Sequence, residues 1–355
     1  MIVSASYRTD IPAFYGDWFM ARLTAGVVRV RNPYGGAELS QSLKRRDVEG
    51  FVFWTRNAGP FMDALAEIDG LGFPFVVQFT ITGYPRALER RVADAGRAVE
   101  QVRAIARRFG PRAGVWRYDP ILDTSLTRPQ WHRENFTRLA AALHGAVDEV
   151  VVSWATIYRK TARNLGAAAN RHGFEWRDPG HEEKRSLLAD LAAIAAEHGM
   201  RLTLCAQPEL LPDAEFRCPP HDLPSCPPHP NPLPGGAREP DRSPSSPSPL
   251  RGEGRGEGEK RKGREGDSEK RREGSGLGLI HPARCIDAGR LSDIAGHPIA
   301  AKTKGNRPGC ACAQSRDIGA YDSCPHGCTY CYAVSDAGRA RARFRTHDPQ
   351  ASILR

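Results

Sequence analysis

Short runs of β-branched and aromatic residues alternate along this chain with longer amphipathic stretches, and this alternation limits the fold more than any other feature. Seven runs are predicted strands, at residues 2–7, 27–31, 51–54, 75–81, 114–118, 149–154 and 201–205. The clearest predicted helices, with apolar residues spaced three and four apart, are residues 87–109, 129–143 and 181–198. The pattern predicts an α/β fold with a mostly parallel sheet, in the form of a (β/α) barrel or partial barrel.

One long stretch interrupts this alternation. Residues 219–249 contain twelve prolines, and residues 251–273 are mainly Gly, Arg, Lys and Glu, so neither part can bury a core. We therefore predict a barrel-like core at 1–217, a disordered insert at 218–281 and a C-terminal segment at 282–355 that packs on the core. The insert carries 11 basic and 10 acidic residues from 219 to 281, so nearly all of the net charge of +10 falls on the core.

Polar residues follow several of the predicted strands. Arg8 and Asp10 follow the first strand, Arg56 follows the third, and Arg117 and Asp119 lie at the end of the fifth. Functional groups of (β/α) barrels gather at these carboxyl ends, so we take the five as candidate catalytic residues. The three arginines would suit a carboxylate or phosphate group. The alternative is that Arg8 pairs with Asp10 and Arg117 with Asp119 in structural ion pairs, and the sequence leaves both interpretations open.

The nine cysteines are unevenly placed, because none precedes Cys205 and five lie between Cys310 and Cys331. The first thirty residues contain charges where a signal peptide needs an apolar core, and no apolar run approaches the ~18 residues of a membrane span. We therefore expect a soluble cytoplasmic protein with no membrane partner. In that compartment, crowded cysteines favour metal ligation over disulfide bonds.

The strongest chemical signal is the segment CPHGCTYCYA. Cys324, Cys328 and Cys331 stand in C-x3-C-x2-C spacing, and the aromatic Tyr330 precedes the last of them. Three thiolates on a short loop can hold three corners of a [4Fe–4S] cluster and leave the fourth iron open for a ligand. An open iron of this kind is what radical S-adenosylmethionine enzymes use, and such an enzyme also needs an electron donor.

Other cysteines leave alternatives open. Cys310 and Cys312 could join Cys328 and Cys331 in a tetrahedral zinc site, although the usual zinc pattern is two C-x2-C pairs. They could also ligate a second cluster or close the fourth corner of the first one. The spacing suggests no role for Cys205, and none for Cys285.

Several segments together resemble a bacterial family named domain of unknown function 1848. They are VSASYRTDIPAFYGDWF, GFVFWTRN, WRYDPIL, LTLCAQPELL, RCID and KGNRPGCACAQSRDIGAYDSCPHGCTYCYA. The family has no established reaction, but its C-terminal cysteines are similar to the cluster-binding loop of radical S-adenosylmethionine proteins. The resemblance implies a cluster on Cys324, Cys328 and Cys331. In those proteins the loop follows the first strand, so the resemblance implies a permuted arrangement in which the C-terminal loop folds back over the strand ends.

Two functions are compatible with these features. The first is an iron–sulfur enzyme similar to radical S-adenosylmethionine enzymes, with a small-molecule or nucleic-acid substrate that carries negative charge. The second is a non-catalytic binding or regulatory protein in which the cysteines hold a structural zinc ion or an electron-transfer cluster.

Overall fold

The computed structural model describes residues 1–32, 35, 37–211 and 280–354. The predicted insert at 218–281 lies outside the described residues except for its last two positions, and so do Cys218 and Cys226.

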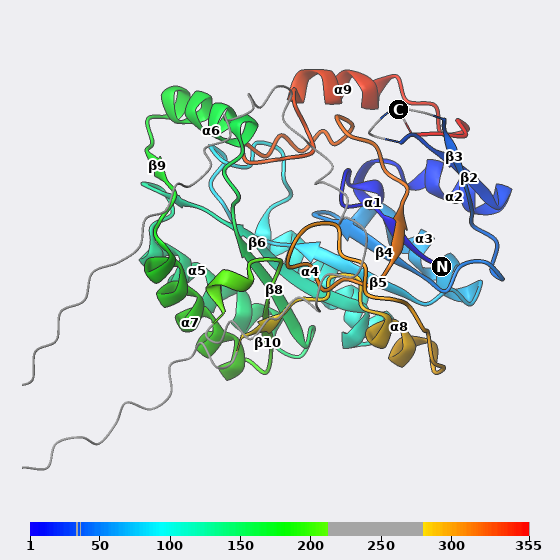
Figure 1. Cartoon of the computed structure of the whole chain (residues 1–355), viewed down its shortest axis with the longest axis horizontal. Coiled ribbons are helices and arrows are strands. Elements are labelled where there is room, and N and C mark those ends of the chain that lie inside the picture. Colours follow the sequence, from blue (N-terminus) through cyan, green and yellow to red (C-terminus); the bar gives the residue numbers. More distant parts are fainter. Residues whose placement is uncertain (33–34, 36, 212–279, 355) are drawn as a thin grey trace, which may run out of the picture.

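An eight-stranded sheet forms the centre of the molecule, and all of its strand pairs are parallel. From edge to edge (Figure 1) the strands are β11 (His281–Pro282), β10 (Arg201–Leu204), β8 (Glu149–Trp154), β6 (Gly114–Ile121), β5 (Phe75–Thr80), β4 (Gly50–Thr55), β1 (Ile2–Ala5) and β12 (Ser315–Asp317). Six of the seven predicted strands belong to this sheet, which confirms the α/β class. The two edge strands, β11 and β12, were not predicted because two or three residues carry no readable pattern.

The two edges of the sheet do not pair as strands. Within the described residues no ladder joins β11 to β12, so a closed barrel is not confirmed. One backbone hydrogen bond connects the segments next to the two edge strands: the Ala313 N–H donates to the Ile286 carbonyl at 2.8 Å. Ile286 follows β11 and Ala313 precedes β12, so the segments beside the two edges meet.

The predicted strand at 27–31 lies outside this sheet. β2 (Val27–Val30) pairs antiparallel with β3 (Leu39–Ser42), and its residues alternate between exposed and buried. This alternation fits a strand covered on one face, whereas the parallel strands are buried on both faces. Arg29 N–H donates to the Ser352 carbonyl at 2.9 Å, so the end of the described chain lies beside β2 (Figure 1).

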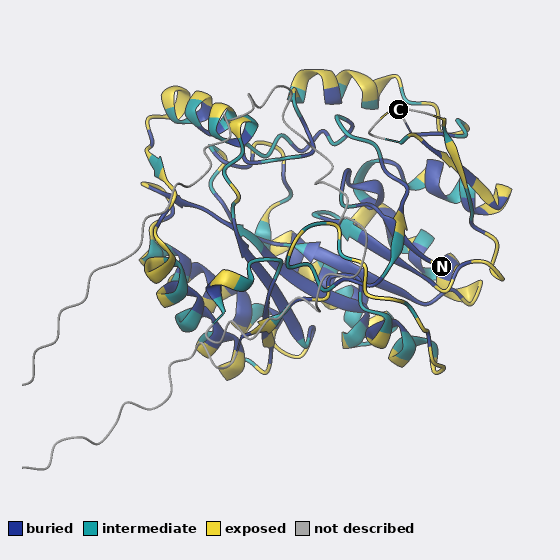
Figure 2. Ribbon diagram, viewed as in Figure 1, coloured by how far each residue is buried: buried dark blue, intermediate teal, exposed yellow. Residues whose placement is uncertain are grey.

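The helices pack mainly on one face of the sheet. They are α1 (Ile11–Phe14), α2 (Gly16–Ala25), α3 (Met62–Gly70), α4 (Ala95–Phe109), α5 (Pro129–Leu143), α6 (Arg159–His172), α7 (His181–Glu197), α8 (Ala288–Ala295) and α9 (Ala337–Arg345). Short 3-10 helices occupy Gly59–Phe61, Pro111–Ala113 and Pro208–Leu210, and β7 (Asp123–Thr124) pairs with β9 (Trp176–Arg177). Figure 2 shows dark blue strands at the centre and yellow on the outer sides of these helices.

Successive residues of the strands point to two different cores. Phe51 and Phe53 of β4 join the core shared with α2, α3, α4, α5 and α7. Val52, between them, faces the other side, where the C-terminal segment and Leu291 of α8 cover the sheet. The C-terminal segment therefore packs against the second face of the parallel sheet.

The helix predicted at 87–109 begins only at Ala95. Asp94 caps it, because its Oδ1 accepts a hydrogen bond from Gly96 N–H at 2.9 Å. The preceding residues form a loop that contains the buried Glu89. The helices predicted at 129–143 and 181–198 are confirmed as α5 and α7. No helix in the described part of the chain has both the length and the apolar character needed to cross a membrane.

Candidate functional site

A pocket of about 310 Å³ opens beyond the carboxyl ends of the parallel strands. All seven cysteines of the described residues line it: Cys205, Cys285, Cys310, Cys312, Cys324, Cys328 and Cys331. The other residues predicted from the sequence also line it, namely Arg8, Asp10, Arg56, Arg117, Asp119 and Tyr330. The structure therefore brings every predicted site residue to one place.

Each of the predicted arginines has a carboxylate partner. Arg8 Nε lies 2.9 Å from Asp317 Oδ1, so the alternative pairing of Arg8 with Asp10 is wrong. Arg117 does form an ion pair with Asp119, and Asp119 also accepts a hydrogen bond from Ser153. These partners offset the positive charge that the sequence predicted at the mouth of the pocket.

Asp317 of β12 holds the loop that follows β1. Its carboxylate accepts hydrogen bonds from the hydroxyls of Ser4 (2.8 Å) and Ser6 (2.7 Å) and from the backbone N–H groups of Tyr7 and Gly319, both at 3.0 Å. A Cβ at Gly319 would lie 2.0 Å from Ser6 Oγ, so only glycine fits there. The edge strand therefore sets the position of the first pocket loop.

Asp10 joins three parts of the site. Its Oδ1 caps α1 by accepting from Ala13 N–H at 2.9 Å, and its Oδ2 accepts from Arg56 N–H at 2.8 Å. The same Oδ2 lies 2.8 Å from Nε2 of His326, which stands between Cys324 and Cys328 in the chain. Asp10 thus positions the cysteine loop rather than facing the open pocket with a free carboxylate.

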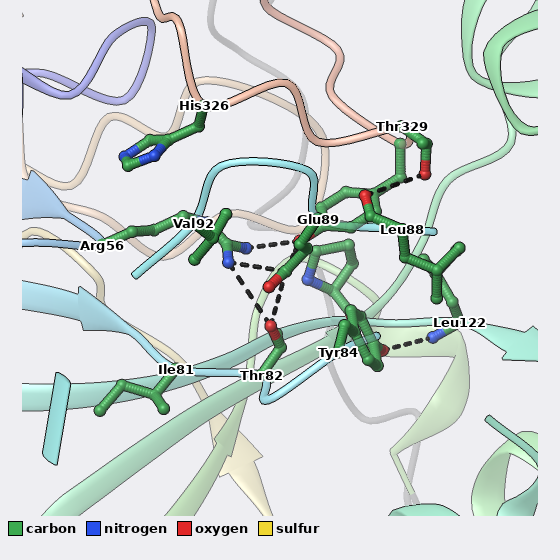
Figure 3. A network of polar contacts seen from close by, with 12 residues as sticks. Arg56, Ile81, Thr82, Tyr84, Leu88, Glu89, Val92, Leu122, His326 and Thr329 are labelled. Carbon is green, nitrogen blue, oxygen red and sulfur yellow. Dashed lines mark hydrogen bonds and ion pairs between the residues drawn. The ribbon is translucent and has the colours of Figure 1, made fainter. Parts of the chain in front are cut away.

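Glu89 is a site residue that the sequence did not reveal. Figure 3 shows Arg56 and Thr82 directed at its carboxylate: Arg56 Nη1 lies 2.7 Å from Oε1, and the Thr82 hydroxyl donates to Oε1 at 2.6 Å. Tyr330 Oη also donates to this carboxylate and accepts a hydrogen bond from Arg56 Nη2 at 2.6 Å. The sequence predicted residues 87–109 to be one amphipathic helix, and in that helix Glu89 would be an exposed residue on the polar face.

Backbone contacts attach the cysteine loop to the segment around Glu89. Thr329 N–H donates to the Leu88 carbonyl at 3.0 Å, and Arg91 N–H donates to the His326 carbonyl at 3.1 Å. Glu89 and Cys328 form an isolated antiparallel bridge. The C-terminal loop therefore lies against the segment that follows β5.

The surroundings of the three loop thiols raise the pKa of each of them. Burial raises the pKa of Cys324, and the nearby Asp10 carboxylate raises it further. Burial raises the pKa of Cys328 to about 12 against the opposing effect of Arg56, and burial also raises the pKa of Cys331. A negative charge on one of these thiols raises the pKa values of its neighbours, so the three lie close enough to interact.

The other four thiols gather on a different part of the pocket wall. Cys205 Sγ and Cys285 Sγ are 3.6 Å apart, and Cys285 interacts in turn with Cys312, which interacts with Cys310. The contacts with Cys205 and Cys312 lower the pKa of Cys285, and Arg117 lowers it further by donating to its sulfur at 3.0 Å. These contacts link Cys310 and Cys312 to Cys285.

Neither thiol group is arranged around a single point. In the part of the chain that the structure describes, no three or more His, Cys, Asp or Glu side chains form a group that could hold a metal ion as they stand.

Three buried polar atoms beside the pocket have no hydrogen-bond partner among the described residues. They are Thr9 Oγ1, Trp154 Nε1 and His326 Nδ1. Buried polar groups in proteins nearly always have partners, so these three atoms could each bond to a water molecule or to a ligand.

The sequence was also compared with known proteins. A family model described as "Domain of unknown function (DUF1848)" matches residues 2–219 and 270–333. The chain belongs to the DUF1848 family. The DUF1848 match includes all seven described cysteines, and it omits residues 220–269, which lie within the predicted insert. No curated protein matches this DUF1848 chain.

Proposed function

We propose that this protein is an iron–sulfur enzyme similar to radical S-adenosylmethionine enzymes, with a [4Fe–4S] cluster held by Cys324, Cys328 and Cys331. The observation that carries the proposal is the position of these three thiols, which one loop presents to a pocket at the carboxyl ends of the strands. In α/β folds this edge of the sheet is where reactive groups gather.

The donor set fits such a cluster. Each thiolate of a cubane binds a different iron, so the three sulfurs need not converge on one point. His326 supports the fit, because it lies in the same loop, is 3% exposed and has a ring nitrogen without a partner among the described residues. Asp10 fixes the other ring nitrogen, so the free one keeps a defined direction.

The protein's own residues would bind and orient the reactants. When bound, a cluster of this kind supplies the electron that cleaves the sulfonium of S-adenosylmethionine. Thr9 and Trp154 offer a hydroxyl and an indole N–H to the polar groups of that cofactor or of the substrate. Within the described residues Arg307 has no carboxylate within ion-pair distance, so this pocket arginine is the one left to meet an anionic group.

The size of the pocket limits the substrate. About 310 Å³ lies at the lower end of the range for small-molecule sites. We therefore favour a small molecule, or a single nucleotide unit of a nucleic acid, that carries a carboxylate or phosphate.

Anaerobic reconstitution tests the proposal. Iron and sulfide would be measured in the wild-type protein and in a Cys324→Ala, Cys328→Ala, Cys331→Ala variant. Electron paramagnetic resonance spectra of the reduced proteins would be recorded before and after addition of S-adenosylmethionine. We expect the wild-type spectrum to change on addition and the variant to show no such change.

Two outcomes would contradict this function. Zinc in place of iron would favour a structural metal site. A cluster with a spectrum that ignores S-adenosylmethionine would favour an electron-transfer or regulatory protein.

A further inference from the structure

Positive charge gathers beside the cysteine loop. Arg90 and Arg91 directly follow the buried Glu89, and both are exposed. A Cβ on Gly327 of the loop would lie 3.7 Å from Arg90 Cβ and 3.9 Å from Arg91 Nη1, so the two arginines lie against the loop. Partial loss of hydration lowers the pKa of Arg91, and the positive charges of Arg341 and Arg90 lower it further. Like charges this close repel one another, so a bound anion would stabilise them.

Two helices without acidic residues flank the same loop. α6 contains three arginines and one lysine, α9 contains four arginines, and neither contains Asp or Glu. Lys160 of α6 donates from Nζ to the Tyr332 carbonyl at 2.6 Å. Phe344 of α9 packs on Phe14 with ring centroids 5.3 Å apart, and Phe14 packs on His326 of the loop at 4.7 Å. Figure 1 shows the green α6 and the red α9 along one side of the molecule.

Five arginines on these segments form what we call the arginine rim: Arg90, Arg91, Arg159, Arg163 and Arg341. Four of them are exposed and Arg341 is half-buried. Within the described residues none of the five has a carboxylate at ion-pair distance, whereas the neighbouring Arg339 pairs with Asp322 at 3.0 Å. Exposed arginines without carboxylate partners are the groups that contact the phosphates of a nucleic-acid backbone.

The pocket beside the arginine rim is lined with aromatic rings. Tyr7, Trp54, Tyr158 and Tyr332 line it, and each is half-buried. The rings of Tyr7 and Trp54 meet edge to face with centroids 6.1 Å apart, so this wall presents rings in more than one orientation. Aromatic side chains of this kind stack on unpaired bases. Tyr158 directly precedes Arg159, so the aromatic wall and the arginine rim meet at the start of α6.

We propose that the arginine rim binds the sugar–phosphate backbone of a single-stranded nucleic acid, and that one base of the strand enters the pocket and stacks on its aromatic rings. A single strand fits better than a duplex, because its bases are free to leave the stack. A pocket of about 310 Å³ has room for one base. Binding to the rim needs no cluster, whereas the use of the strand as a substrate rests on the function proposed above.

Fluorescence anisotropy tests the backbone contact. Labelled uridine and thymidine oligonucleotides of equal length would be titrated with the full chain at several salt concentrations, before and after anaerobic reconstitution. We expect Arg90→Glu, Arg91→Glu to weaken binding by about tenfold or more, and to reduce the salt slope by about 0.7 for each lost phosphate contact. The matched control is Arg107→Glu, Arg108→Glu, with the same change of charge at the exposed end of α4, and it should bind like the wild type. A preference for uridine or for thymidine strands distinguishes RNA from DNA.

An abasic strand tests the entry of a base, because it keeps the phosphates and has nothing to stack. We expect the wild type to bind the base-containing strand at least about fivefold more tightly than the abasic one. Tyr158→Leu should lower this ratio. Tyr158→Phe keeps the ring and should keep the ratio, which separates stacking from the contacts of the hydroxyl.

Three results would overturn the proposal. The first is wild-type affinity in both Arg90→Glu, Arg91→Glu and a second rim variant, Arg163→Glu. The second is displacement of the oligonucleotide by polyglutamate of equal charge as readily as by unlabelled strand, which would indicate an acidic protein partner. The third is equal affinity for the abasic and base-containing strands.

Failure of this proposal can be told apart from failure of the proposed function. Strand binding by a protein with no response to S-adenosylmethionine would support the arginine rim and contradict the radical enzyme. A cluster that responds to S-adenosylmethionine in a protein that binds no strand would do the reverse.

Discussion

His326 Nε2 lies 2.8 Å from Asp10 Oδ2, although the two residues are 316 positions apart along the chain. The contact connects the loop after β1 with the loop that carries Cys324, Cys328 and Cys331. The Asp10 carboxylate also caps α1 and accepts a hydrogen bond from Arg56 N–H, so one side chain connects three segments of the site.

Replacing Asp10 with asparagine should loosen the cysteine loop. An amide NH2 in place of Oδ2 would face the Arg56 N–H as a second donor, so at least one buried donor loses its acceptor, at a cost of about 1–3 kcal/mol. We expect Asp10→Asn to lose reconstituted iron several times faster than the wild type during dialysis against a chelator. Asp17→Asn, at an exposed position in the first turn of α2, is the control. Equal rates of iron loss in the wild type and Asp10→Asn would show that this contact does not hold the loop.

Replacing Glu89 with glutamine should leave the Arg56 guanidinium buried without its counter-charge. Removing one member of a buried ion pair costs about 3–5 kcal/mol. Glu89→Gln should therefore lower the free energy of unfolding in urea by several kcal/mol. Glu67→Gln, on the exposed side of α3, should change it by less than about 0.5 kcal/mol. A Glu89→Gln protein as stable as the wild type would mean that water or another group already screens Arg56.

His132 should make the fold sensitive to acid. Burial lowers its pKa to about 4, and its ring nitrogens each lie 2.8 Å from a partner, Nδ1 from Tyr118 Oη and Nε2 from the Leu122 carbonyl. Between pH 6.5 and 4 the unfolded chain binds a proton at this residue that the folded chain does not, so stability falls as the pH falls. The loss amounts to about 3 kcal/mol at about 1.4 kcal/mol per pH unit.

Urea unfolding of the wild type and His132→Gln at pH 7 and pH 4 checks this prediction. The stability advantage of the wild type should shrink by about 3 kcal/mol at the lower pH. With the exposed His172→Gln variant the difference from wild type should stay constant. A His132→Gln difference that does not change with pH would mean that His132 is protonated in the folded protein.

Deleting residues 220–269, which the family match omits, should leave the fold intact. Leu210 and Ile280, on either side of the undescribed stretch, are buried in the same core. The deletion shortens that connection to about a quarter of its length. The entropic cost of closing the loop falls, and this adds about 1 kcal/mol to the free energy of unfolding. Chemical unfolding and metal analysis of the shortened chain check this. A drop of several kcal/mol would show that the deleted residues contribute to the folded protein.

The sequence predicted the strands well because parallel strands buried on both faces form continuous apolar runs. It also predicted which residues line the pocket, since polar residues at the carboxyl ends of such strands meet at one edge. It did not predict the partner of Arg8. Asp317 lies 309 positions away, in a three-residue edge strand without a pattern of its own.

The grouping of the cysteines was only partly predictable. The spacing of Cys324, Cys328 and Cys331 is local, so the sequence shows it directly. The approach of Cys205 to Cys285 depends on β10 and β11 being neighbours in the sheet, and β11 has only two residues. A contact of this kind depends on tertiary structure, and no local motif encodes it.

The pairing of β1 with β12 has a consequence for synthesis of the protein. A ribosome completes β1, β4, β5, β6 and β8 before the first cysteine, Cys205, is translated, and β12 emerges last among the strands. The early strands can assemble while the last wall of the pocket is still unmade. Loading of any metal on Cys324, Cys328 and Cys331 is therefore a late step of maturation, and a chain released prematurely cannot retain that metal.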